Sequence, residues 1–421
     1  MTRSPKGLLL LIGPGVLVAA TGVGAGDLAT AAFAGSKIGL AVLWAVVVGA
    51  LVKLVLNEQL ARWQLATGTT ILEGALSKLG PVVWAVFGAY LLFWSPFVAA
   101  ALMKACGAVL GAMIPGIPTW AGAVGCSLIG LVMVWIGGFK LFQRVMAVCI
   151  AVMVVVVLAS AAASMPAPLE VLNGFIPRVP TDQQALGWTI ALIGGVGGTL
   201  TIICYSYWMR EAGRGKPEDL KTCRIDLAVG YSITAIFGLA MIVLAAGVAG
   251  DGVLEGRGSS IIVQVSIYIA IETHPAMRWA FLAGSFGAVF SSVLGVWQAV
   301  PYVFADWWRM RPGSSKAGRP MTAVSTTSLA YRGYLVALAT LPCGLLFIQF
   351  ATIQKLYTII GACFIPLLAI TLLLLMNRRS WIGSSLANRW ASNIALTLAI
   401  AVSVVAAYWF IVPRVQSLLG S

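Results

Sequence analysis

The stretch Gly22–Asp27, GVGAGD, places three glycines and a carboxylate inside the first long apolar run of the chain. Glycine weakens a helix because its backbone loses the most freedom on folding, and an acid within an apolar run needs a partner. The stretch therefore predicts a broken helix that restarts at Asp27. Aspartate suits the N-terminus of a helix, so Asp27 caps the new helix, binds a ligand, or does both.

The composition of the chain shows what surrounds this helix. Its 421 residues are 60% hydrophobic and 10% charged, with a mean hydropathy of +0.97, whereas soluble domains carry about 25% charged residues. Since a run of about 20 apolar residues crosses a bilayer, we predict an integral, all-α polytopic membrane protein with no soluble domain and no cleaved leader. The predicted spans are approximately 8–35, 39–63, 82–112, 119–138, 142–165, 186–208, 225–249, 280–305, 333–350, 354–376 and 391–412.

The basic residues predict the orientation of these spans. The net charge is +14, and most of the 27 lysines and arginines fall on the side of the N-terminus. Cytoplasmic loops are enriched in lysine and arginine. We therefore expect a cytoplasmic N-terminus, a C-terminus outside, and a bacterial-type inner or plasma membrane. The positive charge then mostly reflects the topology of the chain and says little about a partner. We expect the lipid bilayer, and no nucleic acid, as a partner.

Motifs for catalysis are missing from the sequence. The seven cysteines are scattered singly, His274 is the only histidine, and neither a phosphate-binding loop nor a nucleophile elbow occurs. Single cysteines in apolar runs usually serve as small apolar side chains. We expect neither an enzyme nor a bound cofactor, and a transported ion or small solute as the partner.

A second glycine cluster, Gly194–Thr199 (GGVGGT), lies in the sixth predicted span, five spans after GVGAGD. Glycine-interrupted spans at corresponding positions of two halves indicate a transporter binding site at mid-membrane. Exposed backbone at that depth is tolerated only where protein or a water-filled cavity covers it. The alternative is that the glycines only allow close helix packing.

The chain from Gly13 onward resembles the Nramp family of proton-coupled divalent-metal transporters. The likeness covers nearly the whole chain and is patchy in spans 3 to 5. It rests on the Gly-Pro-Gly opening at Gly13, the Leu-Ala-Thr and Ala-Gly after the helix break, the Leu-Trp of span 2, Ala61-Arg62 with Thr67-Gly68, Ala191-Leu192 through Gly198-Thr199, and Pro366 followed by MNRRSWIG. The resemblance implies a LeuT-like fold in one transmembrane domain, 1–421, with two inverted five-helix repeats (about 8–165 and 186–376) and an eleventh helix (about 391–412).

The departures from the family concern its binding motifs. Aligned without gaps, the Asp-Pro-Gly-Asn signature of span 1 falls on Gly24–Asp27, so Gly24 replaces the metal-binding Asp and Asp27 the Asn. The Met-Pro-His signature of span 6 falls near Thr201–Ile203, and the span-3 acids and the span-10 glutamine align with Pro96, Ala99 and Phe364. The resemblance thus implies Asp27 as the metal ligand. The substrate-binding residues it implies are Gly24, Ala25, Gly26, Asp27, Thr199, Thr201 and Ile202.

Charged and aromatic residues near these spans carry further expectations. Lys53, in the middle of span 2, is the candidate partner of Asp27 and the coupling candidate: it neutralises structurally, snorkels, or works as an internal cation or proton carrier. Lys104 is expected to snorkel outward, and Glu58 with Arg62 to form an i, i+4 surface pair. An aromatic belt is expected near the cytoplasmic span ends, with Tyr205 as an alternative vestibule residue. The belt consists of Tyr205, Tyr207, Trp208, Trp307 and Trp308.

The remaining ligands predict a function. A thioether favours softer transition metals, and without it the hard oxygens of Asp27, Thr199 and Thr201 suit a partly hydrated magnesium ion. We expect an Nramp-like secondary transporter of divalent cations by alternating access, with altered selectivity and without the usual proton-coupling residues. The alternatives are a LeuT-fold transporter of a small organic solute, bound through its anionic group at half-helix N-termini, and a non-transporting membrane sensor.

Overall fold

The computed structural model describes residues 13–137, 139–250, 261–314 and 325–419, all in helices and connecting turns. The predicted cytoplasmic N-terminal residues 1–12 lie outside this described part. The helices are α1 (Pro14–Gly22), η2 (Val23–Ala29), α2 (Thr30–Ile38), η3 (Gly39–Val42), α3 (Leu43–Thr67), α4 (Ile71–Leu79), α5 (Pro81–Met113), α6 (Thr119–Ile136), α7 (Phe139–Ala163), α8 (Pro168–Asn173), α9 (Gln183–Gly195), η4 (Leu200–Cys204), α10 (Tyr205–Glu211), η5 (Pro217–Asp219), α11 (Leu220–Gly250), α12 (Ile261–Glu272), α13 (Pro275–Arg309), α14 (Leu329–Thr340), η6 (Leu341–Phe347), α15 (Phe350–Ala362), α16 (Phe364–Met376), α17 (Arg379–Ile382) and α18 (Trp390–Leu419).

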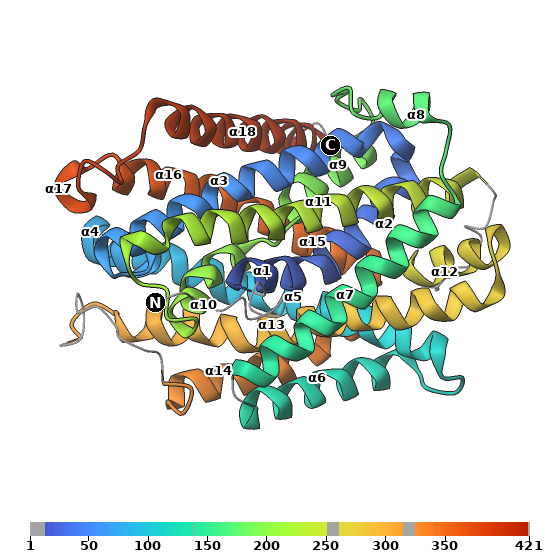
Figure 1. The fold of residues 1–421 in the computed structure, drawn as a ribbon, viewed down its shortest axis with the longest axis horizontal. Coiled ribbons are helices and arrows are strands. Elements are labelled where there is room, and N and C mark those ends of the chain that lie inside the picture. The colour runs from blue at the N-terminus through green and yellow to red at the C-terminus, as the bar shows by residue number, and fades with distance from the viewer. Residues whose placement is uncertain (1–12, 138, 251–260, 315–324, 420–421) are drawn as a thin grey trace, which may run out of the picture.

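The long helices run roughly parallel to one another along the longest axis of the molecule (Figure 1). Helix α4 lies at one end of the bundle, and α8 and α12 lie at the other. We call these the α4 end and the α8 end. Helix α13 packs against α5 and α7, while α11 packs against α1, α2 and α3. The first span therefore lies in the interior of the bundle, between α11 and α13.

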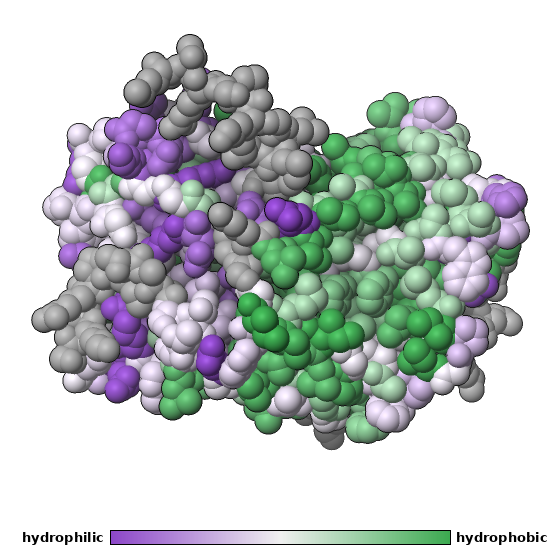
Figure 2. All heavy atoms as spheres, turned by 60° about the horizontal axis from the view of Figure 1, so that its bottom comes forward, coloured by the Kyte–Doolittle hydropathy of each residue, from purple (hydrophilic) through white to green (hydrophobic). Residues whose placement is uncertain are grey.

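Within the described residues, each predicted span corresponds to one helix or to two or three consecutive helical segments. Within the described ranges, nine helical segments are long and apolar enough to cross a membrane, and α12 and the first part of α18 are shorter apolar helices. Apolar side chains such as Val148, Val152 and Val155 of α7 are exposed. Figure 2 shows a broad hydrophobic area on one face, with hydrophilic side chains gathered toward its left end. This surface fits a lipid environment, and the chain is an integral membrane protein.

The first span differs from its predicted form. Val23–Ala29 continues α1 as a π-helix that leads directly into α2, so the helix widens and does not unwind. The residue at the N-cap of α2 is Ala29, in helical conformation, with no side-chain cap. The prediction that Asp27 restarts the helix as an N-cap is therefore wrong. A π-segment keeps the chain helical, and such bulges occur frequently at functional sites.

The sixth span is broken, as the second glycine cluster predicts. Helix α9 ends at Gly195, and the chain resumes in the 3-10 helix η4 at Leu200. Between them Gly197 and Gly198 adopt φ of 73° and 93°, a region that side chains with a Cβ rarely occupy. These two glycines allow the chain to turn between α9 and η4 in the interior of the protein.

Candidate functional site

The two glycine clusters lie in contact at the centre of the molecule. A Cβ placed on Gly22 would lie 2.9 Å from both the carbonyl carbon of Gly197 and the amide nitrogen of Gly198. Only glycine at position 22 lets the first span approach the break in the sixth this closely. On the other side of the first span, the amide of Gly24 donates to Ser292 Oγ of α13 over 2.9 Å. Ala25 and Gly26 are also predicted site residues, but their surroundings lie outside the part of the chain that the structure describes.

Asp27 links the π-segment to the broken span. Its side chain is fully buried, and Oδ1 accepts a hydrogen bond of 2.8 Å from the amide of Gly197. The carboxylate therefore contacts the amide side of the break in span 6. Its second oxygen, Oδ2, is buried and has no hydrogen-bond partner within the described structure. Buried carboxylate oxygens are costly without a partner, so Oδ2 is a candidate ligand atom.

Lys53 contacts the carbonyl side of the same break. Its side chain, on α3, is fully buried and its ammonium donates to the carbonyls of Ile193 at 3.0 Å, Gly194 at 2.8 Å and Val196. The snorkelling interpretation is therefore wrong. Asp27 and Lys53 form no direct ion pair within 4.0 Å among the described residues. Lys53 and Asp27 hold opposite sides of one break.

Polar residues of α3 and α11 also lie beside this break. The sequence analysis did not select them as site residues. Asn57 lies one helical turn after Lys53 and donates through Nδ2 to the hydroxyl of Tyr231 on α11. A Cβ on Gly197 would meet the Tyr231 ring at 2.7 Å and lie near the Thr234 methyl group. The i, i+4 spacing of Lys53 and Asn57 was the only available signal, because it places both on one face of span 2.

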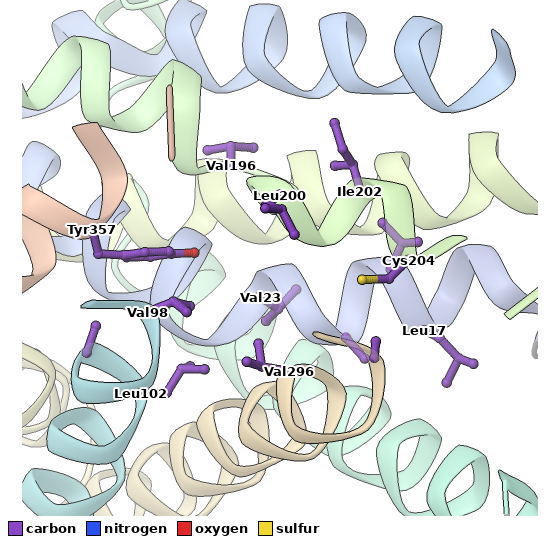
Figure 3. Close-up of a cluster of buried hydrophobic side chains, with 14 of the residues drawn as sticks. Leu17, Val23, Val98, Leu102, Val196, Leu200, Ile202, Cys204, Val296 and Tyr357 are labelled. Atoms are coloured by element: carbon purple, nitrogen blue, oxygen red, sulfur yellow. The ribbon is translucent and has the colours of Figure 1, made fainter. Parts of the chain in front are cut away.

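The opposite face of the break is apolar. Figure 3 shows Val23 of the first span and Leu200 of η4 near Val98 and Leu102 of α5 and Val296 of α13. All five side chains are buried. The predicted site therefore has two faces, a polar one toward α3 and α11 and an apolar one toward α5 and α13.

The remaining predicted site residues follow the break into η4. Thr199, Thr201 and Ile202 are buried. The Thr199 side chain packs against Gly361 of α15, where a Cβ would lie 2.3 Å from its Cγ2. Thr201 Oγ1 lies close to Gly198, at 2.6 Å from the position of a Cβ on that residue. The structure thus brings Asp27, Thr199 and Thr201 to one break, while Ile202 contributes an apolar side chain.

The donor set at this break is poor in metal ligands. No group of three or more His, Cys, Asp or Glu side chains that could hold a metal occurs among the described residues. Among the carboxylates described at this break, a cation would meet the single oxygen Oδ2 of Asp27. Hard, strongly hydrated cations tolerate such a site because magnesium keeps several of its waters and takes only one or two carboxylates.

Charged residues close the α4 end of the bundle. Glu73 of α4 pairs with Arg210 of α10 at 2.5 Å and with Arg309 of α13 at 3.0 Å, and Arg309 also pairs with Asp306 at 2.7 Å. Tyr207 donates to Asp306 over 2.8 Å. Three elements that are distant in sequence are tied together at this end.

These contacts correct the predicted aromatic belt. Tyr205, Tyr207, Trp208 and Trp307 are buried in protein, and only Trp308, 45% exposed, lies at the surface as predicted. Trp208, for example, donates through Nε1 to Gln298 of α13. Polar partners inside the bundle hold Tyr207, Trp208 and Trp307 away from lipid.

The predicted surface pair of Glu58 and Arg62 also requires correction. The pair forms at 2.8 Å, but the Arg62 side chain is only 6% exposed. Its other nitrogens donate to the Leu386 and Ala387 carbonyls and to Asn388 before α18. Arg62 thus attaches the last helix to α3.

The α8 end of the bundle contains a cavity of about 1100 Å³. Phe33 of α2, Phe350 of α15 and Lys104 of α5 are among the residues that line it. Lys104 lines this cavity, and its ammonium donates to the carbonyls of Leu346, at 2.8 Å, and Ile348. The ring of Phe33 stacks on Trp188 of α9, with centroids 4.8 Å apart. Side chains of the first and sixth spans thus meet beside the cavity.

The meeting of the first span with a broken sixth span inside an all-helical membrane bundle is an arrangement typical of LeuT-like transporters. A manganese transporter from Eremococcus coleocola superimposes with a TM-score of 0.74, at 16% identity, over 100% of this chain and 91% of that one. MhsT in complex with L-phenylalanine gives a TM-score of 0.61, at 17% identity, over 94% of this chain and 98% of that one. These likenesses establish the LeuT-like fold.

The family follows from the sequence itself. Residues 15–413 match the model of the Nramp family, described as natural resistance-associated macrophage protein-like. The chain therefore belongs to the Nramp family. The divalent metal cation transporter MntH of Bradyrhizobium diazoefficiens is 26% identical over 255 residues, which cover 57% of this chain and 55% of that relative. The match thus spans little more than half the length of this curated relative.

Proposed function

We propose that the protein is a secondary transporter that moves a hard divalent cation across the membrane by alternating access. The observation that carries this proposal is Asp27 Oδ2, a fully buried carboxylate oxygen without a hydrogen-bond partner, beside the broken span of an Nramp family member. Family membership and the MntH relative support a divalent cation as the substrate.

The chemistry of the break supports a change in selectivity. Sulfur ligands favour softer metals such as iron over magnesium, and Thr201–Ile203 supply none. Apart from the Lys53 ammonium and the Asn57 amide, the buried side chains described beside Asp27 at the break carry hydroxyl groups or are apolar. We infer that the protein discriminates weakly between manganese and magnesium and carries the cation partly hydrated.

The ends of the bundle support one orientation of this transport. The α4 end carries the ion pairs of Glu73, and basic residues gather there, as in the cytoplasmic loops of membrane proteins. We propose that the α4 end faces the cytoplasm, with the N-terminus on that side. The cavity at the α8 end is then an outward-facing vestibule.

Uptake into proteoliposomes tests the function. We expect manganese uptake that magnesium in equal concentration reduces by about half, because similar affinities make the two ions equal competitors. Strong preference for manganese would contradict the proposed selectivity. Absence of uptake of any divalent cation by folded protein would contradict the function itself.

The apolar face of the break favours one competing function, transport of a small organic solute. Val23, Val98 and Leu102 would contact an apolar group of such a solute. A thermal-shift screen distinguishes the two. Stabilisation by divalent cations and not by organic anions supports the cation transporter, and the reverse supports the solute transporter.

A further inference from the structure

The break in span 6 leaves carbonyl groups that the helix cannot satisfy. The last four carbonyls of a helix lack partners within it and carry the negative end of its dipole. The backbone satisfies two groups near the end of α9, because Val196 N donates to Leu192 and Gly198 N donates to Gly195. The carbonyls of Ile193, Gly194 and Val196 remain, and all three accept from Lys53.

These three carbonyls form what we call the span-6 carbonyl site. A lysine ammonium has three donors, and here each donor has one carbonyl acceptor. Gly49, one turn before Lys53 on α3, permits this approach because a Cβ at that position would lie 3.0 Å from Ile193 O. The site is closed to solvent, since Lys53 is fully buried and Asp27 lies on the other side of the break.

Carbonyls at the C-terminal end of a broken helix are the groups that bind coupling cations in secondary transporters. We propose that the ammonium of Lys53 occupies such a monovalent-cation site and acts as a tethered cation. The wild-type protein then needs no sodium or other free monovalent cation to hold the break in span 6. This inference goes beyond the proposed function. Occupation of the site by Lys53 does not depend on that function, and only the expected effect on uptake rests on it.

Removal of the side chain tests the proposal. In Lys53→Ala, the span-6 carbonyl site is vacant and a small cation can enter. We expect the melting temperature of this variant to be lower than that of the wild type in N-methylglucamine chloride. It should rise by about 2 °C or more in sodium, methylammonium or ethylammonium chloride at equal ionic strength. The wild type should melt at one temperature in all four salts.

Lys104→Ala is the matched control. Lys104 is also a lysine within a span that donates to backbone carbonyls, but it lines the cavity at the α8 end, where water can replace it. Its variant should show no dependence on the cation. A melting temperature of Lys53→Ala that is the same in all four salts, or an equal rise in Lys104→Ala, would overturn the proposal.

Lys53→Met keeps the approximate length of the side chain and removes its charge. This variant tests the proposal if Lys53→Ala does not fold in any salt. The proposal predicts that Lys53→Met loses at least about tenfold in uptake and gains no stability from any of the cations, because its side chain fills the site. Wild-type uptake by Lys53→Met would show that only the volume of the side chain matters. The melting experiment needs no substrate, so failure of divalent uptake in the wild type would refute the proposed function and leave this inference standing.

Discussion

Asp27 holds the amide of Gly197 with one oxygen and keeps the other available for a cation. In Asp27→Asn the amide oxygen can still accept from Gly197, so the break in span 6 stays supported while the charge is lost. We expect divalent uptake to fall by roughly 10- to 100-fold, as happens even when supporting residues of metal sites are replaced. The melting temperature should change little.

Asp182→Asn provides the matched control for this substitution. Asp182 also accepts one backbone hydrogen bond, from Ala185 N at 2.7 Å, and caps α9 at the surface. Asparagine caps a helix as well as aspartate does, so uptake should be unchanged. Equal uptake by Asp27→Asn and wild type would assign Asp27 to support of the backbone alone.

The residues that carry charge in the spans were recognisable in the sequence, but their partners were not. Asp27 and Lys53 stand out because a charge in an apolar run is costly. Their partners are backbone groups of span 6, about 140 to 170 residues away, and no local pattern indicates a backbone partner. Asn57 and Tyr231 carry no charge, so the sequence gives little reason to select them.

The π-segment of the first span depends on close packing against α13. A Cβ on Gly24 would lie 2.2 Å from Ser292 Oγ. We expect Gly24→Ala to destabilise the protein by about 1–3 kcal/mol, the usual cost of adding a methyl group to a packed core. Thermal unfolding in detergent should show a lower melting temperature, and the double variant Gly24→Ala/Ser292→Gly should regain part of the loss.

Gly125→Ala in α6 is the control for this pair, because a Cβ there meets no atom within 4 Å. Alanine is favoured over glycine within a helix by up to about 1 kcal/mol, so this variant should be as stable as wild type or slightly more so. If Gly24→Ala behaved like Gly125→Ala, the packing of the π-segment against α13 would be wrong.

Helix positions were easier to predict than helix interruptions. Hydropathy located the spans because about 20 apolar residues are needed to cross a bilayer. Glycine clusters predicted a break in span 6 correctly, where Gly197 and Gly198 have positive φ, and in span 1 they instead allow close packing and a π-helix. Composition cannot separate these two uses of glycine. The turn at Cys363 between α15 and α16 has no such signal.

The whole bundle is closed at the α4 end by the ion pairs of Glu73, which lies 137 and 236 residues from its two partners. Glu73→Gln removes the charge that both Arg210 and Arg309 face. Loss of one partner from a buried pair costs about 3–5 kcal/mol, and we expect the lower end because the arginines are partly exposed. The melting temperature should fall.

The same variant should open this end of the protein more often. Cys204, at the end of η4, is fully buried, so its alkylation by maleimide, followed by peptide mass spectrometry, reports opening. Alkylation should be faster in Glu73→Gln. In the control Arg224→Gln, which breaks an exposed pair with Glu58 worth about 0–1 kcal/mol, both readouts should match wild type. Unchanged Cys204 alkylation in Glu73→Gln would contradict the closing role of these ion pairs.

The most direct test of the proposed function is the location of the bound cation. Crystals of the protein soaked in manganese should show one anomalous-scattering peak in the interior, beside Asp27 Oδ2 and the segment from Gly197 to Thr201, and magnesium in excess should remove it. The peak should be absent from Asp27→Asn. A manganese peak elsewhere in the bundle, or one that persists in Asp27→Asn, would contradict the proposal that Asp27 binds the transported cation.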